Sequence, residues 1–219
     1  MAAAGTRRRP LRVSGPGLPP RVGPGFAGRL AAVSVVGMIP PDPRPIALVG
    51  LMGAGKSAVA RALGERLGAA VADLDAMVEA DRGCSVAELF EREGEAAFRR
   101  LEGRILAEAL ASGAGIVACG GGIVLDPERR RALAARCDVV WLEVSPAAAA
   151  RRLAGTWNSR PLLGADESGR PRDPVRRLEE LLAIRKPLYE EVADARVPVD
   201  GRTPDQVADE VLRVLRSRA

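Results

Sequence analysis

The sequence predicts an α/β fold in which a parallel β-sheet is covered by helices on both faces. Short, wholly apolar segments alternate along the chain with longer segments that have helical spacing. Strands that read as continuous apolar runs are typical of parallel sheets, because such strands are buried on both sides. The first run leads into a glycine-rich turn, and in such sheets ligands bind beyond the carboxyl ends of the strands.

The first part of this alternation begins at Pro45. Residues 46–49 form an all-apolar run that predicts a strand, and residues 58–67 have helical spacing that stops at Gly68. A second apolar run covers residues 70–74. We therefore expect a strand, a glycine-rich turn, a helix and a second strand at the start of the folded part.

A long helix should follow, because Ser85 and Glu88 match a capping box. This helix is expected to extend to about Ala111, with a break near Gly94. The later segments are apolar runs at 116–119 and 139–144, helices at 146–153 and 175–184, a mobile loop at 154–176, and a last strand at 197–199. The final helix begins with Thr203, Pro204 and Gln206, which fit an N-cap and first turn, and extends to about Arg216.

Residues 1–44 read as a disordered extension, or as the result of a start codon upstream of the true one at Met38. Nine of the seventeen prolines lie in residues 1–45, and residues 1–37 carry six arginines and no acidic residue. The rest of the chain holds 27 cationic and 28 anionic residues, so we expect no nucleic-acid binding there. No apolar run is long enough for a membrane helix, so we expect no membrane partner.

Histidine is absent from the chain, which excludes a histidine general base, a Ser-His-Asp triad and histidine metal ligands. The three cysteines, Cys84, Cys119 and Cys137, are odd in number and far apart. They predict free thiols in a reducing, cytoplasmic compartment rather than a disulfide framework.

The glycine-rich turn at residues 50–57 reads GLMGAGKS and matches the pattern G-x-x-x-x-G-K-[ST] between a predicted strand and a predicted helix. Glycines let backbone N–H groups approach phosphate oxygens, and the following helix presents its positive end to the same anion. Lys56 would place its charge on the β- and γ-phosphates, and Ser57 would offer a hydroxyl to Mg²⁺. The motif predicts ATP or GTP binding rather than a chance turn.

Two acidic residues, Asp73 and Asp75, lie at the end of the second apolar run. They would share one face if the strand continued. A phosphate-transferring enzyme needs a carboxylate to hold Mg²⁺ and benefits from an acceptor for the proton of the attacking hydroxyl. The alternative is that one or both only cap a helix that starts near Ala76. Residues 120–122, three glycines after the third run, suit a close approach of backbone to substrate, a tight turn, or both.

Three arginines, Arg99, Arg160 and Arg185, are candidates for binding anions. Spacing alone favours solvated charges, because the chain is rich in arginine. A loop arginine such as Arg160 could nevertheless close over the γ-phosphate and stabilise transition-state charge. A bidentate guanidinium is also suited to hold a substrate carboxylate.

With these residues in place, the chain resembles the shikimate kinase family over residues 45–215. The matching segments, in family order, are GLMGAGKS, DLDAMVE, CSVAELFEREGEAAFRRLE, CGGGIV, NSRPLL, IRKPLYEEVA and GRTPDQVADEVL. The resemblance implies a P-loop NTPase fold of the nucleoside-monophosphate-kinase type in residues 45–219. This fold has a five-stranded parallel sheet, a small substrate-binding part at about 76–105 and a lid at about 154–176. The implied activity is ATP-dependent phosphorylation of shikimate to shikimate 3-phosphate, in aromatic amino acid biosynthesis, by a cytoplasmic monomer.

The resemblance also implies a role for each matched residue. ATP would be bound by Gly53, Ala54, Gly55, Lys56, Ser57, Ala58, Arg152, Arg160, Arg202 and Pro204. Shikimate would be bound by Asp75, Arg99, Gly121 and Arg185, with Phe90, Phe98 and Glu102 as the wall and its support. Mg²⁺ would be held by Ser57 and Asp73, and the catalytic residues would be Lys56, Asp75 and Arg160.

The chain departs from the family pattern at three places. Ala58 replaces a second hydroxyl residue, the lid segment 164–174 is several residues longer than usual, and Trp157 stands beside the lid arginine. These departures concern the geometry of the lid and the turnover more than identity.

Two alternatives remain open at this point. One is another small-metabolite kinase of the same fold, such as a gluconate kinase, in which Arg99 and Arg185 would be redundant. The other is a nucleotide-binding regulatory or scaffold protein without catalysis, against which the complete set of candidate catalytic residues argues. Activity toward gluconate with none toward shikimate would decide for the first alternative, and release of ADP with and without shikimate tests the second.

Overall fold

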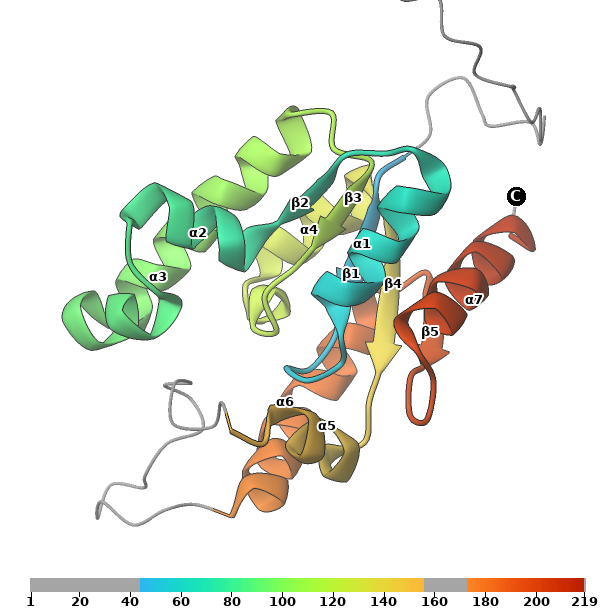
Figure 1. The fold of residues 1–219 in the computed structure, drawn as a ribbon. Coiled ribbons are helices and arrows are strands. Elements are labelled where there is room, and N and C mark those ends of the chain that lie inside the picture. The colour runs from blue at the N-terminus through green and yellow to red at the C-terminus, as the bar shows by residue number, and fades with distance from the viewer. Residues whose placement is uncertain (1–43, 156–172, 219) are drawn as a thin grey trace, which may run out of the picture. The chain divides into compact units, whose positions relative to one another are not determined.

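The computed structural model describes residues 44–155 and 173–218, and these form a parallel sheet with helices on both faces (Figure 1). The strands are β1 (Ile46–Val49), β2 (Val71–Asp73), β3 (Ile116–Ala118), β4 (Asp138–Glu143) and β5 (Ala195–Pro198). They pair only in parallel, in the order β2-β3-β1-β4-β5. The predicted five-stranded parallel sheet is therefore confirmed.

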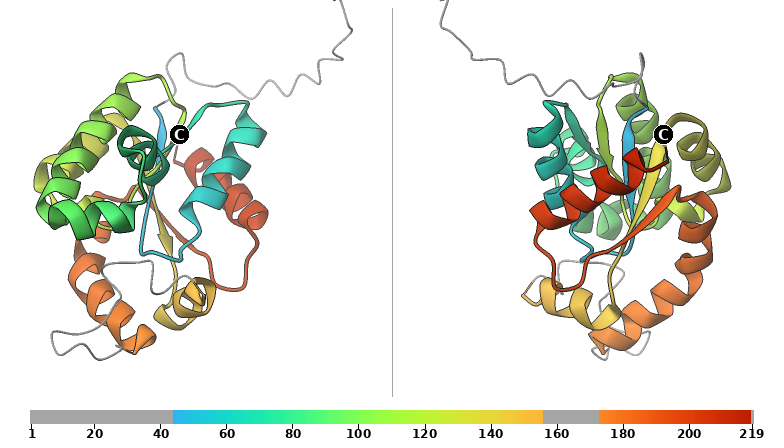
Figure 2. Two further views of the ribbon diagram at one scale, coloured as in Figure 1. Left: turned by 60° about the vertical axis from the view of Figure 1, so that its left-hand side comes forward. Right: turned by 90° about the vertical axis from the view of Figure 1, so that its right-hand side faces the viewer.

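Helices connect the strands and cover the sheet. They are α1 (Lys56–Leu67), α2 (Leu74–Arg82), α3 (Val86–Ala111), α4 (Pro127–Arg136), α5 (Pro146–Leu153), α6 (Pro174–Val192) and α7 (Pro204–Arg216), with a 3₁₀ turn at Ile123–Leu125. Figure 2 shows α1 and α7 on one side of the strands and α3 on the other. The described helices thus enclose the sheet in the way that its continuous apolar strands require.

The strands divide their side chains between two hydrophobic cores. Ile46 and Leu48 pack into the core under α1, α5 and α7, whereas Ala47 and Val49 pack into the core under α3 and α4. All four residues of β1 are buried, because this central strand is covered on both faces. The two cores hold the strands in place, and the site is built on the carboxyl ends of these strands.

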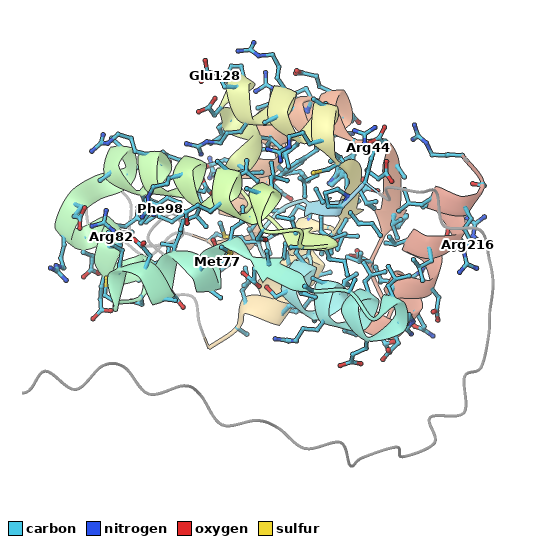
Figure 3. The ribbon with its side chains drawn as sticks, turned by 90° about the horizontal axis from the view of Figure 1, so that it is seen from above. Arg44, Met77, Arg82, Phe98, Glu128 and Arg216 are labelled. Carbon is cyan, nitrogen blue, oxygen red and sulfur yellow. The ribbon has the colours of Figure 1, made fainter. Side chains whose placement is uncertain are left out.

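The N-terminal caps predicted for α3 and α7 are both present. At the start of α3, Glu88 N–H donates to the Ser85 hydroxyl, and Ser85 N–H donates to the Glu88 carboxylate at 2.8 Å. The expected break also occurs, because Gly94 has φ 79° and ψ 170° inside α3. Phe90 before the kink and Phe98 after it face each other, with ring centroids 4.6 Å apart. Figure 3 places Phe98 and Arg82 in the part built by α2 and α3, away from Arg44 and Arg216.

The structure differs from the sequence prediction at three elements. The second strand ends at Asp73 and α2 begins at Leu74, because Asp73 caps this helix by accepting from the N–H of Ala76 at 3.3 Å. Helix α4 was not predicted, since its residues PERRRALAAR form no apolar stripe. Helix α6 continues past Pro187 to Val192, because Tyr189 and Val192 are buried in the core and hold the helix together.

The described part of the chain begins with an arginine that is bound to the folded domain. Arg44, the first described residue, donates to the carbonyl oxygens of Ala134 and Cys137 at 2.6 Å each. In the described part of the chain, no helix combines the length and apolar character that crossing a bilayer requires. The predicted extension, apart from Arg44, lies outside the described residues, as does the central part of the predicted lid, residues 156–172.

Candidate active site

The phosphate-binding loop connects β1 to α1 at the centre of the sheet. Gly53 and Gly55 have φ angles of 79° and 86°, a left-handed backbone that favours glycine and turns successive N–H groups in one direction. Lys56 Nζ folds back over the loop and donates to the carbonyl oxygens of Gly50 at 2.9 Å and Leu51 at 3.2 Å. Burial lowers the pKa of Lys56, and nearby Asp75 opposes that change. The loop thus holds one cation at the N-terminal end of α1, where an anion is favoured.

The acidic pair lies where β2 meets α2. The two carboxylates are not on one strand face, because Asp75 is already in the first turn of α2. Asp73 does cap the helix, as the alternative explanation held, but both side chains also line the cavity beside Lys56 and Ser57. Capping and a role in the site are therefore compatible for Asp73. Helix geometry, rather than strand geometry, directs Asp75 into the cavity.

The glycine turn after β3 separates two arginines. On one side, Arg185 of α6 is only 3% exposed, and its Nη1 donates to the Gly121 carbonyl at 3.3 Å. On the other side, a Cβ at Gly122 would lie 2.5 Å from Arg99 Nη2, so only glycine lets the guanidinium of Arg99 come this close. Tyr189 O–H donates to the same Gly121 carbonyl at 2.6 Å. The turn is thus held in place from α6.

The guanidinium of Arg99 is held on α3 by two carboxylates. Nη1 donates to Glu102 at 2.8 Å, and Nη2 donates to Glu95 at 3.0 Å. Burial works against the charge, but Glu102 and Glu95 more than offset it, so the pKa of Arg99 lies above its ordinary value. Arg99 therefore remains a cation with a fixed orientation in the wall of the cavity.

One cavity of about 920 Å³ connects all these groups. The predicted residues that line it are Gly53, Gly55, Lys56, Ser57, Ala58, Asp73, Asp75, Phe90, Phe98, Arg99, Glu102, Gly121, Arg152 and Arg185. Arg152 joins the phosphate-binding loop to the residues after β5, because it donates to the carbonyls of Gly53 at 3.1 Å and Val199 at 2.7 Å. The carboxyl ends of β1, β2 and β3 thus converge on one cavity, as expected for this fold.

A few predicted residues lie elsewhere. Ala54 is buried in the core, and Pro204 is exposed at the start of α7. Arg202 lines a second hollow of about 400 Å³ together with Gly201, Gln206 and Glu210. Arg160 lies outside the described residues.

Several residues of the site were not predicted from the sequence. Arg61, Glu79 and Cys119 also line the cavity, and Arg129 holds Glu102 from behind. Asp126 followed by Pro127 fits an N-cap and first helical position, and this signal could have located α4 and Arg129. No local pattern marks Arg61, which lies on α1, or Cys119, which follows β3, as residues of the cavity.

The donor set suits Mg²⁺ but does not enclose it. In the described ranges, no three Cys, Asp or Glu side chains are grouped so that they could hold a metal ion. The Ser57 hydroxyl and the carboxylates of Asp73 and Asp75 do line one cavity. A few hard oxygen donors fit Mg²⁺, which usually keeps water and phosphate oxygens among its ligands.

A phosphate-binding loop, an acidic pair and an arginine-lined wall around one cavity define a P-loop phosphotransferase for a small anionic acceptor. Comparison with known proteins narrows this class. The family model "Shikimate kinase" matches residues 52–216. The chain therefore belongs to the shikimate kinase family.

Individual relatives agree with this assignment. A shikimate kinase of Symbiobacterium thermophilum is 42% identical over 174 residues, covering 79% of this chain and 97% of that protein. One of Corynebacterium efficiens is 45% identical over 173 residues, covering 78% and 97%. The solved shikimate kinase from Acinetobacter baumannii in complex with shikimate is 34% identical, with a TM-score of 0.74, covering 80% of this chain and 94% of that one.

Proposed function

We propose that the chain transfers the γ-phosphoryl group of ATP to a hydroxyl of shikimate, giving ADP and shikimate 3-phosphate for aromatic amino acid biosynthesis. The observation that carries the proposal is the single cavity, which brings Lys56, Asp75 and Arg99 together. Such a cavity offers a place for a triphosphate at one end and for an organic anion at the other. Membership of the shikimate kinase family supports shikimate as that anion.

In this proposal the phosphate-binding loop holds ATP and Lys56 supplies the fixed positive charge. The residues that contribute to the ATP side are Gly53, Ala54, Gly55, Lys56, Ser57, Ala58, Arg152, Arg202 and Pro204. In the transition state, negative charge is spread over the equatorial oxygens of the transferred phosphoryl group. A preorganised cation stabilises that charge without reorganisation. Arg160 is predicted to approach from the lid.

The acceptor is held at the other end of the cavity. Arg99 and Arg185 would bind the carboxylate from two sides of the glycine turn, and Gly121 would offer backbone contacts. Fork-shaped guanidinium groups give a carboxylate both charge and direction. Asp75 would accept a hydrogen bond from the attacking hydroxyl and receive its proton as the new bond to phosphorus forms.

Mg²⁺ would be held by Ser57 and Asp73, where it would neutralise phosphate charge when bound. Free thiols at Cys84, Cys119 and Cys137 support action in a reducing compartment, which we propose is the cytoplasm. We also propose that the protein acts as a monomer, without nucleic acid or membrane partners.

The test is release of ADP, measured in a coupled assay with ATP, Mg²⁺ and either shikimate, gluconate or no acceptor. ADP release that requires shikimate is expected. ADP release with gluconate alone would assign the chain to the gluconate kinases instead. ATP binding without ADP release for any acceptor would favour a nucleotide-binding protein without catalysis.

A further inference from the structure

Glu102 is a buried carboxylate between two arginines. It is 1% exposed, and its Oε2 accepts from Arg99 Nη1 and from Arg129 Nη1, both at 2.8 Å. Its Oε1 has no hydrogen-bond partner within the described chain, and a Cβ at Gly120 would clash with this oxygen. A buried carboxylate is costly unless it is paired, so the position of Glu102 depends on these two cations.

Arg129 contacts α3 at two points from the first turn of α4. Besides binding Glu102, its Nη2 donates to the carbonyl oxygen of Arg99, and its Nε lies 3.4 Å from Asp126 Oδ2. Gly103 makes room for it, because a Cβ there would lie 3.2 Å from Nε and Nη2. Arg129 thus holds the backbone of residue 99 directly and its side chain through Glu102.

The charge balance of this cluster matters for anion binding. Arg99 and Glu102 alone would be a neutral pair, and Glu102 would compete with a substrate carboxylate for Arg99. The second cation leaves the three most buried members with a net positive charge, since Arg129 is 10% exposed and Arg99 is 18% exposed. The two other acids, Glu95 and Asp126, are 51% and 39% exposed, so water and salt screen them more strongly.

We propose that Arg129 is a positioning residue for the acceptor site. It pairs with Glu102 and fixes α3 at residue 99. The guanidinium of Arg99 therefore keeps its direction and is neutralised less by Glu102, so it stays available to the acceptor's carboxylate. Arg129 itself does not line the cavity. The identity of that carboxylate rests on the proposed function, whereas the contacts of Arg129 do not.

The first experiment compares KM for shikimate, KM for ATP and kcat in Arg129→Met and the wild type. Losing a charged hydrogen bond that orients Arg99 should raise KM for shikimate about tenfold. KM for ATP should change less than about twofold, because the phosphate-binding loop is untouched. Arg129→Lys keeps the charge without the fork and should recover part of the loss. Arg131→Met is the matched control, since Arg131 lies in the same helix with a side chain 72% exposed.

The second experiment asks whether Arg129 acts through Glu102. In a Glu102→Gln background, Arg129→Met should add much less to KM for shikimate than it does in the wild type, because its partner is no longer charged. An equal effect in both backgrounds would overturn the proposal, as would a change below about twofold in the single variant. If Arg129→Met does not fold, Arg129→Lys and Arg129→Gln carry the same comparison. Wild-type protein without shikimate kinase activity would instead contradict the proposed function, and shikimate affinity by calorimetry would then test Arg129 separately.

Discussion

The side chain of Arg99 illustrates how one residue is prepared before any ligand arrives. Its guanidinium is held by Glu95 and Glu102 and lies beside the glycine turn, in the wall of the cavity that also contains Lys56. Ordering a long side chain costs conformational entropy, and this cost has already been met in the folded protein. A preoriented arginine therefore binds a carboxylate more tightly than a mobile one, because little entropy is lost on binding.

Replacing Arg99 with alanine should raise KM for shikimate by about 100-fold, because the cavity loses a charged, forked donor. The KM for ATP should stay nearly unchanged, since Arg99 does not contact the phosphate-binding loop. Steady-state kinetics with each substrate varied in turn measures both constants. An equal loss in ATP affinity would show that the acceptor site has been misplaced.

Lys56→Met tests the other end of the cavity. The lysine is bound to the carbonyl oxygens of Gly50 and Leu51 at the start of the phosphate-binding loop, whereas Arg152 contacts the loop at Gly53. Methionine keeps the length of the side chain but not its charge, so kcat should fall at least about 100-fold. Circular dichroism and thermal unfolding check that the variant is folded. Residual turnover near the wild-type rate would contradict the proposed role of Lys56.

At the scale of elements, the kink in α3 shapes the acceptor wall. Gly94 holds φ 79° and ψ 170°, and a Cβ there would meet no other atom within 4 Å, so the constraint comes from the backbone alone. This conformation is almost restricted to glycine. The kink brings Phe90 and Phe98 together beside the cavity, so α3 contributes two separate helical segments to one wall.

Gly94→Ala should therefore lower the free energy of unfolding by about 1–3 kcal/mol. If the helix straightens to relieve the strain, Phe90 moves and KM for shikimate should rise as well. Denaturant unfolding measures the first effect and steady-state kinetics the second. Arg100→Ala, at an exposed position of the same helix, should change stability by less than about 0.5 kcal/mol. Equal stability of Gly94→Ala and wild type would show that the backbone there is not strained.

At the scale of the whole molecule, the sequence predicted the alternation of strands and helices because that alternation follows from local patterns. The five strands and the caps of α3 and α7 agree with those patterns. Helix α4 was missed because arginines occupy the positions where an apolar stripe would be expected. The sequence left open whether Asp73 and Asp75 share a strand face or cap a helix, because the end of β2 depends on capping by Asp73, which competes with strand pairing.

The candidate site was predictable only where one short motif defines it. The phosphate-binding loop could be located from its glycines, Lys56 and Ser57 alone. The pairing of Glu102 with Arg129 joins residues 27 positions apart on two helices, and no local spacing indicates it. The family resemblance named Glu102 as a support, but only the structure reveals that the Arg129 side chain reaches from α4 to α3 and supports Glu102 in turn.

Several buried groups make the stability of the whole fold sensitive to alkaline pH. Burial raises the pKa of the Cys137 thiol from 9.0 to about 11 and that of Tyr189 from 10.0 to about 12, and it also raises the pKa of Cys119. Above pH 9 the unfolded chain releases these protons while the folded protein keeps them, so the unfolded state binds fewer protons and stability falls as pH rises. Lys56 acts in the opposite direction, because burial lowers its pKa from 10.5. The contribution of a single raised group is therefore best isolated by removing it, and Cys137 is suited to this because it lies away from the phosphate-binding loop.

We expect the Cys137 thiol alone to lower the free energy of unfolding by about 2 kcal/mol between pH 8 and pH 10.5, since each pKa unit corresponds to about 1.4 kcal/mol. Denaturant unfolding at a series of pH values measures the decline. Cys137→Ala, compared by slope rather than by absolute stability, should make the decline shallower from pH 9 upward, because its thiol no longer titrates in the unfolded chain. The same slope in Cys137→Ala and in the wild type would contradict the expectation, because it would show that the Cys137 thiol titrates in the folded protein as it does in the unfolded chain and is therefore reached by water.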